Sequence, residues 1–159
     1  MDNKVYEIEK LAEILAEEKT AGNQIVFTNG CFDLLHIGHT RYLAQAKAKG
    51  DILVVGLNSD SSVKKLKGDK RPLIPQDERA EMLSNLEMVD YVTIFADETA
   101  KNVIAELEPD IYVKGGDYSI NNLPEAEVVQ QYGGAIELVS EIKGASTTNI
   151  VNKILETYE

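Results

Sequence analysis

Residues 24–50 read QIVFTNGCFDLLHIGHTRYLAQAKAKG, and they hold the strand-to-helix transition on which the fold depends. The apolar run at residues 24–28 predicts a buried strand. Residues 37–50 carry apolar side chains at helical spacing and stop at a glycine, the residue favoured just beyond a helix. The two histidines of the chain, His36 and His39, lie at the junction. The stretch therefore predicts a strand followed by a helix, with both imidazoles between them.

The rest of the chain repeats this alternation of apolar strands and helices. Continuous apolar runs predict further strands at residues 51–57, 90–95, 110–115 and 135–140. Helical spacing and end signals predict helices at residues 5–19, 76–89, 98–109, 125–134 and 146–158. Alternating apolar strands and helices are typical of a parallel sheet covered on both faces. We therefore predict an α/β fold with a doubly wound, parallel, five-stranded sheet of the Rossmann-like type.

The predicted elements fit a single domain of residues 1–159. It would consist of an N-terminal amphipathic helix within residues 1–22 and an α/β core at residues 23–159. Residues 58–75 are polar and rich in lysine, and we expect a mobile connection there with a short helix at its start. Ligands of such sheets bind beyond the carboxyl ends of the strands. This rule nominates the segments TNGCFD, GLNSD, VKGGDY and EIKGASTT.

The composition limits the environment and the partners of the chain. Its 159 residues are 43% hydrophobic and 27% charged, as in ordinary globular domains. The net charge of −11 argues against wrapping nucleic acid, which requires a basic face. No apolar run is long enough for a bilayer, and the acidic N-terminus lacks the features of a secretion signal. With one cysteine, Cys31, we expect a cytoplasmic protein without an intrachain disulfide.

Positive charge is concentrated in residues 64–71, which read KKLKGDKR. Five of the sixteen basic residues lie here, among them Lys67 and Arg71. In an acidic protein, such a segment suits the binding of a small polyanion rather than a polymer. The alternative is a solvated surface loop, and the segment by itself leaves both interpretations open.

The histidine pair has the surroundings of an anion site. Residues three apart share one face of a helix, so a helix that starts near Ile37 places both imidazoles on its first turn. Free N–H groups and the positive end of the helix dipole lie there too. Gly38, between the histidines, lets a phosphate or a planar ring approach the backbone closely. Since neither a P-loop nor a G-x-G-x-x-G motif is present, we predict a different cradle for a nucleoside triphosphate.

Three other interpretations of these residues stay open at this point. Cys31, His36 and His39 are plausible zinc ligands, although no second cysteine cluster completes such a site. Cys31 could act as a nucleophile with a histidine as its base. The two histidines could also be structural and satisfy polar groups of a turn.

Two motifs resemble those of a known superfamily. CFDLLHIGH resembles the H-x-G-H signature of the nucleotidylyltransferases, which also include class I aminoacyl-tRNA synthetases, and GASTTNIVNK resembles their second signature. The resemblance implies that His36 and His39 hold the phosphates of the triphosphate and of its transition state. Ser146, Thr147 and Thr148 would form the opposing clamp with hydroxyls and helix N-terminal amides.

Within the superfamily, nearly the whole chain resembles the adenylyltransferases of ADP-heptose synthesis. The matching segments include GLNSDSSVKKLKG, RPLIPQDERAEML, VKGGDY and LPEAEVV. The resemblance implies a stand-alone enzyme that joins ATP and D-glycero-D-manno-heptose 1-phosphate. One departure is Ala145, where relatives often have tyrosine. The alternatives are a cytidylyltransferase for glycerol 3-phosphate or a similar polyol phosphate and, in another class, a catalytically silent nucleotide-binding sensor.

The resemblance and the cationic segment together assign roles to particular residues. Catalysis is assigned to His36, His39, Lys67 and Arg71. Nucleotide binding is assigned to Thr28, Asn29, Gly30, Cys31, Phe32, Asp33, Gly38, Arg79, Lys114, Gly115, Ser146, Thr147 and Thr148. Binding of the sugar phosphate is assigned to Asn58, Lys114 and Asp117.

Two alternatives stay open for each of Asp33, Arg79 and the first helix. Asp33 would either cap the next turn or orient a phosphate-bound Mg²⁺, and Arg79 would contact phosphate or form a structural salt bridge. Mg²⁺ is expected to bind mainly through the triphosphate, without a dedicated protein site. The amphipathic first helix would either cover the sheet or serve as the surface of a homodimer.

Overall fold

The computed structural model describes residues 3–116 and 118–159, so the predicted substrate-binding residue Asp117 lies outside the described residues. The strands are β1 (Ile25–Gly30), β2 (Ile52–Asn58), β3 (Tyr91–Phe95), β4 (Ile111–Gly115) and β5 (Ala135–Val139). The helices are α1 (Ile8–Thr20), α2 (Ile37–Lys47), α3 (Asp60–Lys67), α4 (Gln76–Ser84), α5 (Lys101–Leu107), α6 (Ala126–Gln131) and α7 (Thr147–Tyr158), with a 3₁₀ turn, η1, at Ile120–Asn122.

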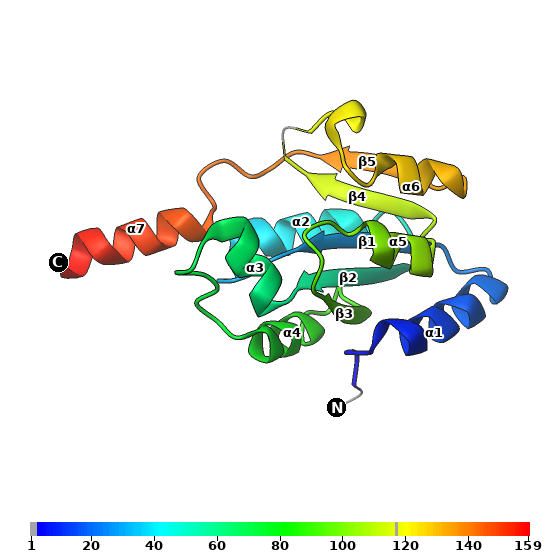
Figure 1. The fold of residues 1–159 in the computed structure, drawn as a ribbon, viewed down its shortest axis with the longest axis horizontal. Helices are drawn as coiled ribbons and strands as arrows, with labels where there is room; N and C mark the ends of the chain where they lie inside the picture. Colours follow the sequence, from blue (N-terminus) through cyan, green and yellow to red (C-terminus); the bar gives the residue numbers. More distant parts are fainter. Residues whose placement is uncertain (1–2, 117) are drawn as a thin grey trace.

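The strands form one parallel, five-stranded sheet in the order β3-β2-β1-β4-β5. The chain runs outward from β1 to β3 and then returns to the other side of β1 through β4 and β5 (Figure 1). The strand order therefore reverses between β1 and β4, which is where doubly wound sheets bind ligands at their carboxyl edge. The predicted fold class is confirmed.

Two apolar cores hold helices against the two faces of the sheet. On one face, α1, α5 and α6 pack against side chains such as Phe27 and Tyr112. On the other face, α2 and α4 pack against side chains such as Val26 and Val113. Successive residues of a strand point to opposite faces, so each strand needs apolar residues throughout to serve both cores. This explains the continuous apolar runs in the sequence.

The first helix covers the sheet with its apolar face. Leu11 and Leu15 are buried in the core shared with α5. The helix starts later than predicted, because residues 4–6 are extended and pair with the edge strand β3. The N–H of Val92 donates to the Lys4 carbonyl at 2.9 Å, and the N–H of Tyr6 donates to the Val92 carbonyl at 3.0 Å. The predicted connection at residues 58–75 contains a helix, α3, capped by the Ser59 side chain.

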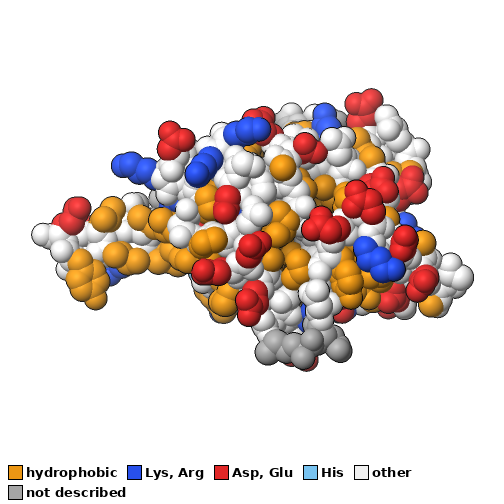
Figure 2. Space-filling view, turned by 60° about the horizontal axis from the view of Figure 1, so that its bottom comes forward, with side chains coloured by type: hydrophobic (Ala, Val, Ile, Leu, Met, Phe, Trp, Pro, Cys, Tyr) orange, Lys and Arg blue, Asp and Glu red, His pale blue; other side chains and the backbone are white. Residues whose placement is uncertain are grey.

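The last helix, α7, contrasts with the others because none of its residues is buried. It projects away from the sheet in Figure 1, and apolar side chains line the projection in Figure 2. Ile154, Leu155 and Tyr158 are 49%, 47% and 84% exposed. Only the amino end of this helix therefore lies near the sheet. Among the described residues, no helix has both the length and the apolar character needed to cross a bilayer.

Candidate active site

The first signature forms a tight structure at the carboxyl edge of β1. Phe32 takes a left-handed backbone conformation, with φ of 45°, and turns the chain toward α2. His36 then caps α2, since its Nδ1 accepts the N–H of Gly38 at 3.1 Å. The rings of His36 and His39 stack with centroids 3.8 Å apart, and the Phe32 ring lies 5.2 Å from that of His39. The two imidazoles therefore form one stacked pair at the helix start.

Both imidazoles are held in their neutral form. Burial, together with the neighbouring His36, lowers the pKa of His39 to about 4, and the Leu34 backbone opposes this shift. Among the described residues, the buried Nδ1 of His39 has no hydrogen-bond partner. Burial also lowers the pKa of His36. Because Nδ1 of His36 accepts a hydrogen bond, its proton lies on Nε2. The pair therefore offers neutral N–H donors beside the positive dipole end of α2.

The second signature reaches the same place from the other end of the chain. Ser146 caps α7 by accepting the N–H of Asn149 at 3.0 Å. The Thr147 hydroxyl donates to the Leu34 carbonyl, in the first signature, at 3.3 Å. A Cβ built on Gly38 would lie only 2.9 Å from the Cβ of Ala145. The structure thus brings the two signatures into direct contact.

A groove runs between the two signatures. It has a volume of about 450 Å³, and its lining residues are His36, Ile37, Arg41, Ile142, Lys143, Gly144, Ala145, Ser146 and Ile150. Sequence reasoning did not identify Arg41, Lys143 or the three isoleucines. The available signal was their position, since each lies within a few residues of a signature. The groove combines apolar walls, two cations and two helix amino ends.

Asp33 and Arg71 come together beside the first signature. The Asp33 carboxylate accepts backbone N–H groups of Leu73 and Ile74 and forms an ion pair with Arg71 at 3.2 Å. Asp33 was expected to cap the next turn or to orient Mg²⁺. The structure instead places both of its oxygens on the segment before α4.

Arg79 occupies a different position from the one expected for a nucleotide ligand. Its side chain is completely buried, and it donates to the carbonyls of Cys31, Asn58 and Ile74 at 2.6, 2.9 and 2.8 Å. It also pairs with Asp60 at 2.8 Å. These four acceptors occupy the guanidinium, so the structure favours the structural alternative. Arg79 ties the ends of β1 and β2 to α3 and to the segment before α4.

Several other predicted ligands use their side chains inside the protein. Thr28 is buried and shares a hydrogen bond with the Tyr42 hydroxyl. The Asn58 amide is buried and donates to Ser62 at 2.8 Å. The side-chain oxygen of Asn29, Oδ1, accepts a hydrogen bond from the Tyr112 hydroxyl at 2.6 Å. These groups hold the carboxyl edge in shape, and the two buried side chains are not free to reach a ligand.

The two glycines Gly30 and Gly115 have a packing reason. A Cβ on Gly30 would lie 2.9 Å from the Phe32 ring, and one on Gly115 would lie 2.9 Å from the Tyr42 ring. Aromatic rings therefore fill the space that a side chain would need.

Two lysines, Lys67 and Lys114, lie close enough to Cys31 for their charges to act on its thiol. Burial raises the pKa of Cys31, which disfavours a thiolate nucleophile. The positive charge of Lys67, the exposed last residue of α3, opposes this rise. Burial lowers the pKa of Lys114, and its ammonium lies 5.5 Å from the centre of the Tyr118 ring. Lys67, Lys114 and Cys31 thus share one region of the edge.

The zinc interpretation finds no support in the geometry. Cys31, His36 and His39 do not form a group that could hold a metal ion. Within residues 3–116 and 118–159, no group of three or more His, Cys, Asp or Glu residues has that arrangement.

The three residues of the predicted hydroxyl clamp differ in exposure. Thr148 is exposed, whereas Ser146 and Thr147 are half-buried.

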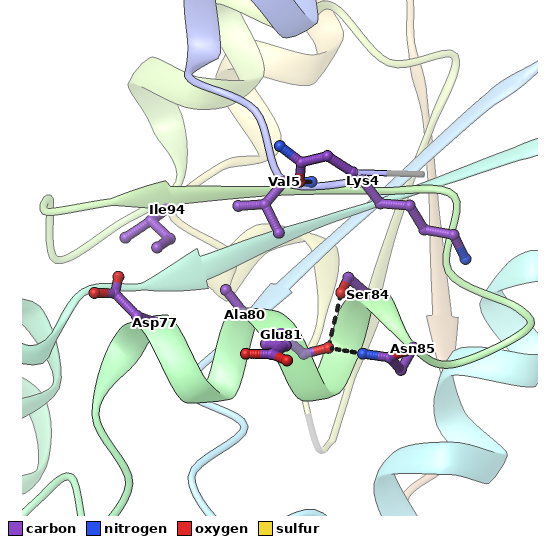
Figure 3. Close-up of a pocket in the computed structure, with 9 residues that line it drawn as sticks. Lys4, Val5, Asp77, Ala80, Glu81, Ser84, Asn85 and Ile94 are labelled. Carbon is purple, nitrogen blue, oxygen red and sulfur yellow. Dashed lines mark hydrogen bonds between the residues drawn. The ribbon is translucent and has the colours of Figure 1, made fainter. Parts of the chain in front are cut away.

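A second hollow lies apart from both signatures. It has a volume of about 410 Å³ and lies between the N-terminal segment, α4 and β3 (Figure 3). In this hollow, Ser84 and Asn85 both donate to the carbonyl of Glu81 at 2.8 Å. It contains none of the predicted site residues, and neither signature lines it. We therefore place the candidate site at the groove between the signatures.

The fold and the paired signatures define a nucleotidyltransferase. The family described as Cytidylyltransferase-like matches residues 27–153, and this chain belongs to that family. The class of enzyme predicted from the two signatures is thereby confirmed.

Relatives narrow the similarity further. The chain is 54% identical over 157 residues to the bifunctional protein HldE of Geobacter sulfurreducens and 53% identical to that of Geobacter metallireducens. Each match covers 99% of this chain but 32% of the relative, so the chain spans about a third of the length of these curated relatives. A solved structure, the lipopolysaccharide core biosynthesis protein of Thermoplasma volcanium, is 29% identical with a TM-score of 0.62, covering 78% of this chain and 100% of its own.

Proposed function

We propose that this chain transfers the adenylyl group of ATP to D-glycero-D-manno-heptose 1-phosphate, releasing pyrophosphate and forming ADP-heptose. The single observation that carries the proposal is the contact between the two signatures, which line one groove. The extended resemblance to adenylyltransferases of ADP-heptose synthesis specifies the sugar. The HldE relatives and a neighbour named for lipopolysaccharide core biosynthesis support the same pathway. ATP and sugar phosphates are cytoplasmic metabolites, which supports the predicted location.

The proposed reaction is a direct in-line displacement. An oxygen of the sugar phosphate attacks the α-phosphorus of ATP, and the bond from that phosphorus to the oxygen bridging to the β-phosphate breaks. The electron pair leaves with pyrophosphate. A phosphomonoester has its second pKa near 6, so it is mostly dianionic at neutral pH and requires no general base. The protein therefore has to align the reactants and stabilise negative charge.

The neutral histidine pair and the helix amino ends suit that electrostatic task. Nε2–H of His36 is available as a donor, because Nδ1 already accepts the N–H of Gly38. The positive dipole ends of α2 and α7 lie on either side of the groove and add to this stabilisation. Donors that are fixed before the reaction stabilise developing charge without reorganisation. We assign the α- and β-phosphates to the space between the two helix starts.

Charge from the cationic segment would complete the phosphate site. We propose that Lys67 and Arg71 contact the triphosphate, since the charge of Lys67 acts on Cys31 at the end of β1 and Arg71 is anchored beside the first signature. Lys114 would contact the phosphate of the sugar. The apolar walls of Ile37, Ile142 and Ile150 would cover the base, in a volume suited to a small ligand.

Magnesium is expected at this site as a complex with the triphosphate substrate. Within the described residues there is no cluster of metal-binding side chains, and both oxygens of Asp33 are occupied by backbone N–H groups and Arg71. The residues present therefore do not fit an ion held by the protein. We propose that Mg²⁺ enters with the triphosphate, as its usual complex.

The proposal is tested by a screen for pyrophosphate release. ATP, CTP and GTP would each be combined with heptose 1-phosphates and with glycerol 3-phosphate, with His36→Asn as the inactive control. We expect release with ATP and a heptose 1-phosphate only. Release with CTP and glycerol 3-phosphate would replace the proposal with the cytidylyltransferase alternative. ATP binding without release from any pair would indicate a sensor.

A further inference from the structure

Among the described residues, the Asp33 carboxylate accepts hydrogen bonds from one segment only, residues 71–74. The side chain is 5% exposed, at the turn between β1 and α2. Oδ1 accepts the N–H groups of Leu73 and Ile74 at 2.8 and 2.9 Å. Oδ2 accepts the Leu73 N–H at 2.9 Å and a guanidinium N–H of Arg71 at 3.2 Å. One carboxylate therefore fixes both the backbone of this segment and the cation at its start.

We infer that Asp33 is a positioning residue that aims Arg71 at the triphosphate. The inference rests on the proposed function, because it assigns Arg71 to phosphate. Within the described parts of the chain, the guanidinium of Arg71 bonds to Asp33 alone, through Nη1. A guanidinium has five N–H donors in a fixed plane. An ion pair at one nitrogen therefore sets the direction of the remaining donors.

The two oxygens of Asp33 have separable tasks. Oδ1 accepts both backbone N–H groups, those of Leu73 and Ile74, whereas Oδ2 shares the Leu73 N–H and is the oxygen that meets Arg71. An asparagine in this position can keep its carbonyl oxygen at the place of Oδ1. Its NH₂ group would then replace Oδ2 and present donors to a cation. Asp33→Asn is therefore expected to keep the segment in place and to release Arg71.

This geometry also distinguishes positioning from metal binding. A carboxylate that holds Mg²⁺ must present a free lone pair to the ion, and Mg²⁺ itself prefers to be surrounded by oxygen ligands. Asp33 instead lies among N–H groups and a guanidinium, which are donors. These surroundings suit an anchored anion and oppose a bound cation.

The test is a double-mutant cycle of Asp33→Asn and Arg71→Ala. Turnover and KM for ATP would be measured in heptose 1-phosphate adenylylation. Asp90→Asn is the matched control, because Asp90 likewise accepts a backbone N–H, that of Leu53 at 2.7 Å, and pairs with a cation, Lys47. We expect each single site variant to lower kcat roughly 10- to 100-fold, the range for lost transition-state donors. The double variant should lose no more than the single ones, and the control should keep its turnover.

Three results would overturn the inference. These are losses that multiply in the double variant, turnover of Asp33→Asn equal to that of the original protein, and recovery of that variant at raised Mg²⁺. Asp33→Ala separates folding from positioning, since it alone should also lower the melting temperature. The same cycle measured on the dissociation constant of ATP should show smaller but again equal, non-additive losses. If no sugar phosphate reacts, the proposed function fails. The double-mutant cycle on the dissociation constant of ATP would still test whether Asp33 positions Arg71.

Discussion

The two helices that start at the candidate site are capped alike but supported differently. At α2, His36 accepts the N–H of Gly38, and at α7, Ser146 accepts the N–H of Asn149. The body of α2 buries Leu43 in the core, whereas α7 has no buried residue. Local capping therefore does not distinguish the two halves of the site, but packing does. The histidine half is fixed by the core, and the hydroxyl half is held mainly by contacts at its own amino end.

The contacts that join the halves are few among the described residues. They include the hydrogen bond from Thr147 to the Leu34 carbonyl and the close approach of Ala145 to Gly38. A helix of 12 residues is marginally stable alone, so these contacts matter for the position of α7. The comparison leads to four predictions about the two halves.

The largest effect is expected from the histidines. Alanine at His36 or His39 should lower kcat about 100-fold or more, the scale for losing one preorganised donor. His36→Asn separates capping from catalysis, because asparagine is a good N-cap residue. It should keep the melting temperature and still lose turnover in a pyrophosphate-release assay. Full activity of His36→Ala would remove the imidazole from the mechanism.

The next effect concerns the stability of the two helices. Leu43→Ala in α2 should lower the free energy of unfolding by about 2–5 kcal/mol, because it opens a cavity in the core. Leu155→Ala in α7 should change it by less than about 0.5 kcal/mol, since that side chain is exposed. Urea unfolding of both variants checks the contrast. Equal losses would mean that α7 is packed in solution.

A smaller effect is expected where the halves touch. Gly38→Ala would place a Cβ 2.8 Å from the His36 ring and 2.9 Å from the Cβ of Ala145. We expect the lightly held Ala145 segment to move, which should lower turnover about tenfold through misalignment. The melting temperature should not fall, because alanine is the better helix residue. A loss of stability with unchanged kcat would show that the core half gives way instead.

The smallest effect is a pH dependence of stability. The pKa of His39 is about 4 in the folded protein and near 6.5 when unfolded, so the unfolded chain binds more protons between these values. The free energy of unfolding should therefore fall as the pH drops from 6.5 toward 4, by about 1–2 kcal/mol after solvent screening. His39→Gln should lack this part of the acid loss. Urea unfolding at several pH values measures both proteins. An equal fall in the free energy of unfolding between pH 6.5 and pH 4 would contradict the assignment to His39.

The sequence predicted the fold well, for a physical reason. Apolar runs, helical spacing and capping residues act over a few neighbours along the chain, so their pattern is legible without coordinates. This held for each of the five strands. The helix expected at residues 5–19 was less accurate at its start, because Lys4 and Tyr6 pair with Val92, far along the chain. No local signal carries such a partner.

The roles of polar residues near the strand ends were harder to predict. Arg79 and Arg71 look alike in the sequence as cations near a phosphate-binding region. The first is surrounded by four acceptors and completely buried, and the second pairs with Asp33 alone among the described residues. Thr28 and Asn58 likewise turned inward to partners on other elements. Whether such a group is free depends on its neighbours in space.

The sequence by itself determined the alternating strands and helices, the two histidines at one helix start and the hydroxyl residues at another. The tertiary structure alone decided that both helix starts meet in one groove and which nearby charges are already satisfied. The physical reason is range. Propensity, periodicity and capping act along the chain, whereas burial, ion pairing and the meeting of distant segments depend on how the sheet brings strand ends together.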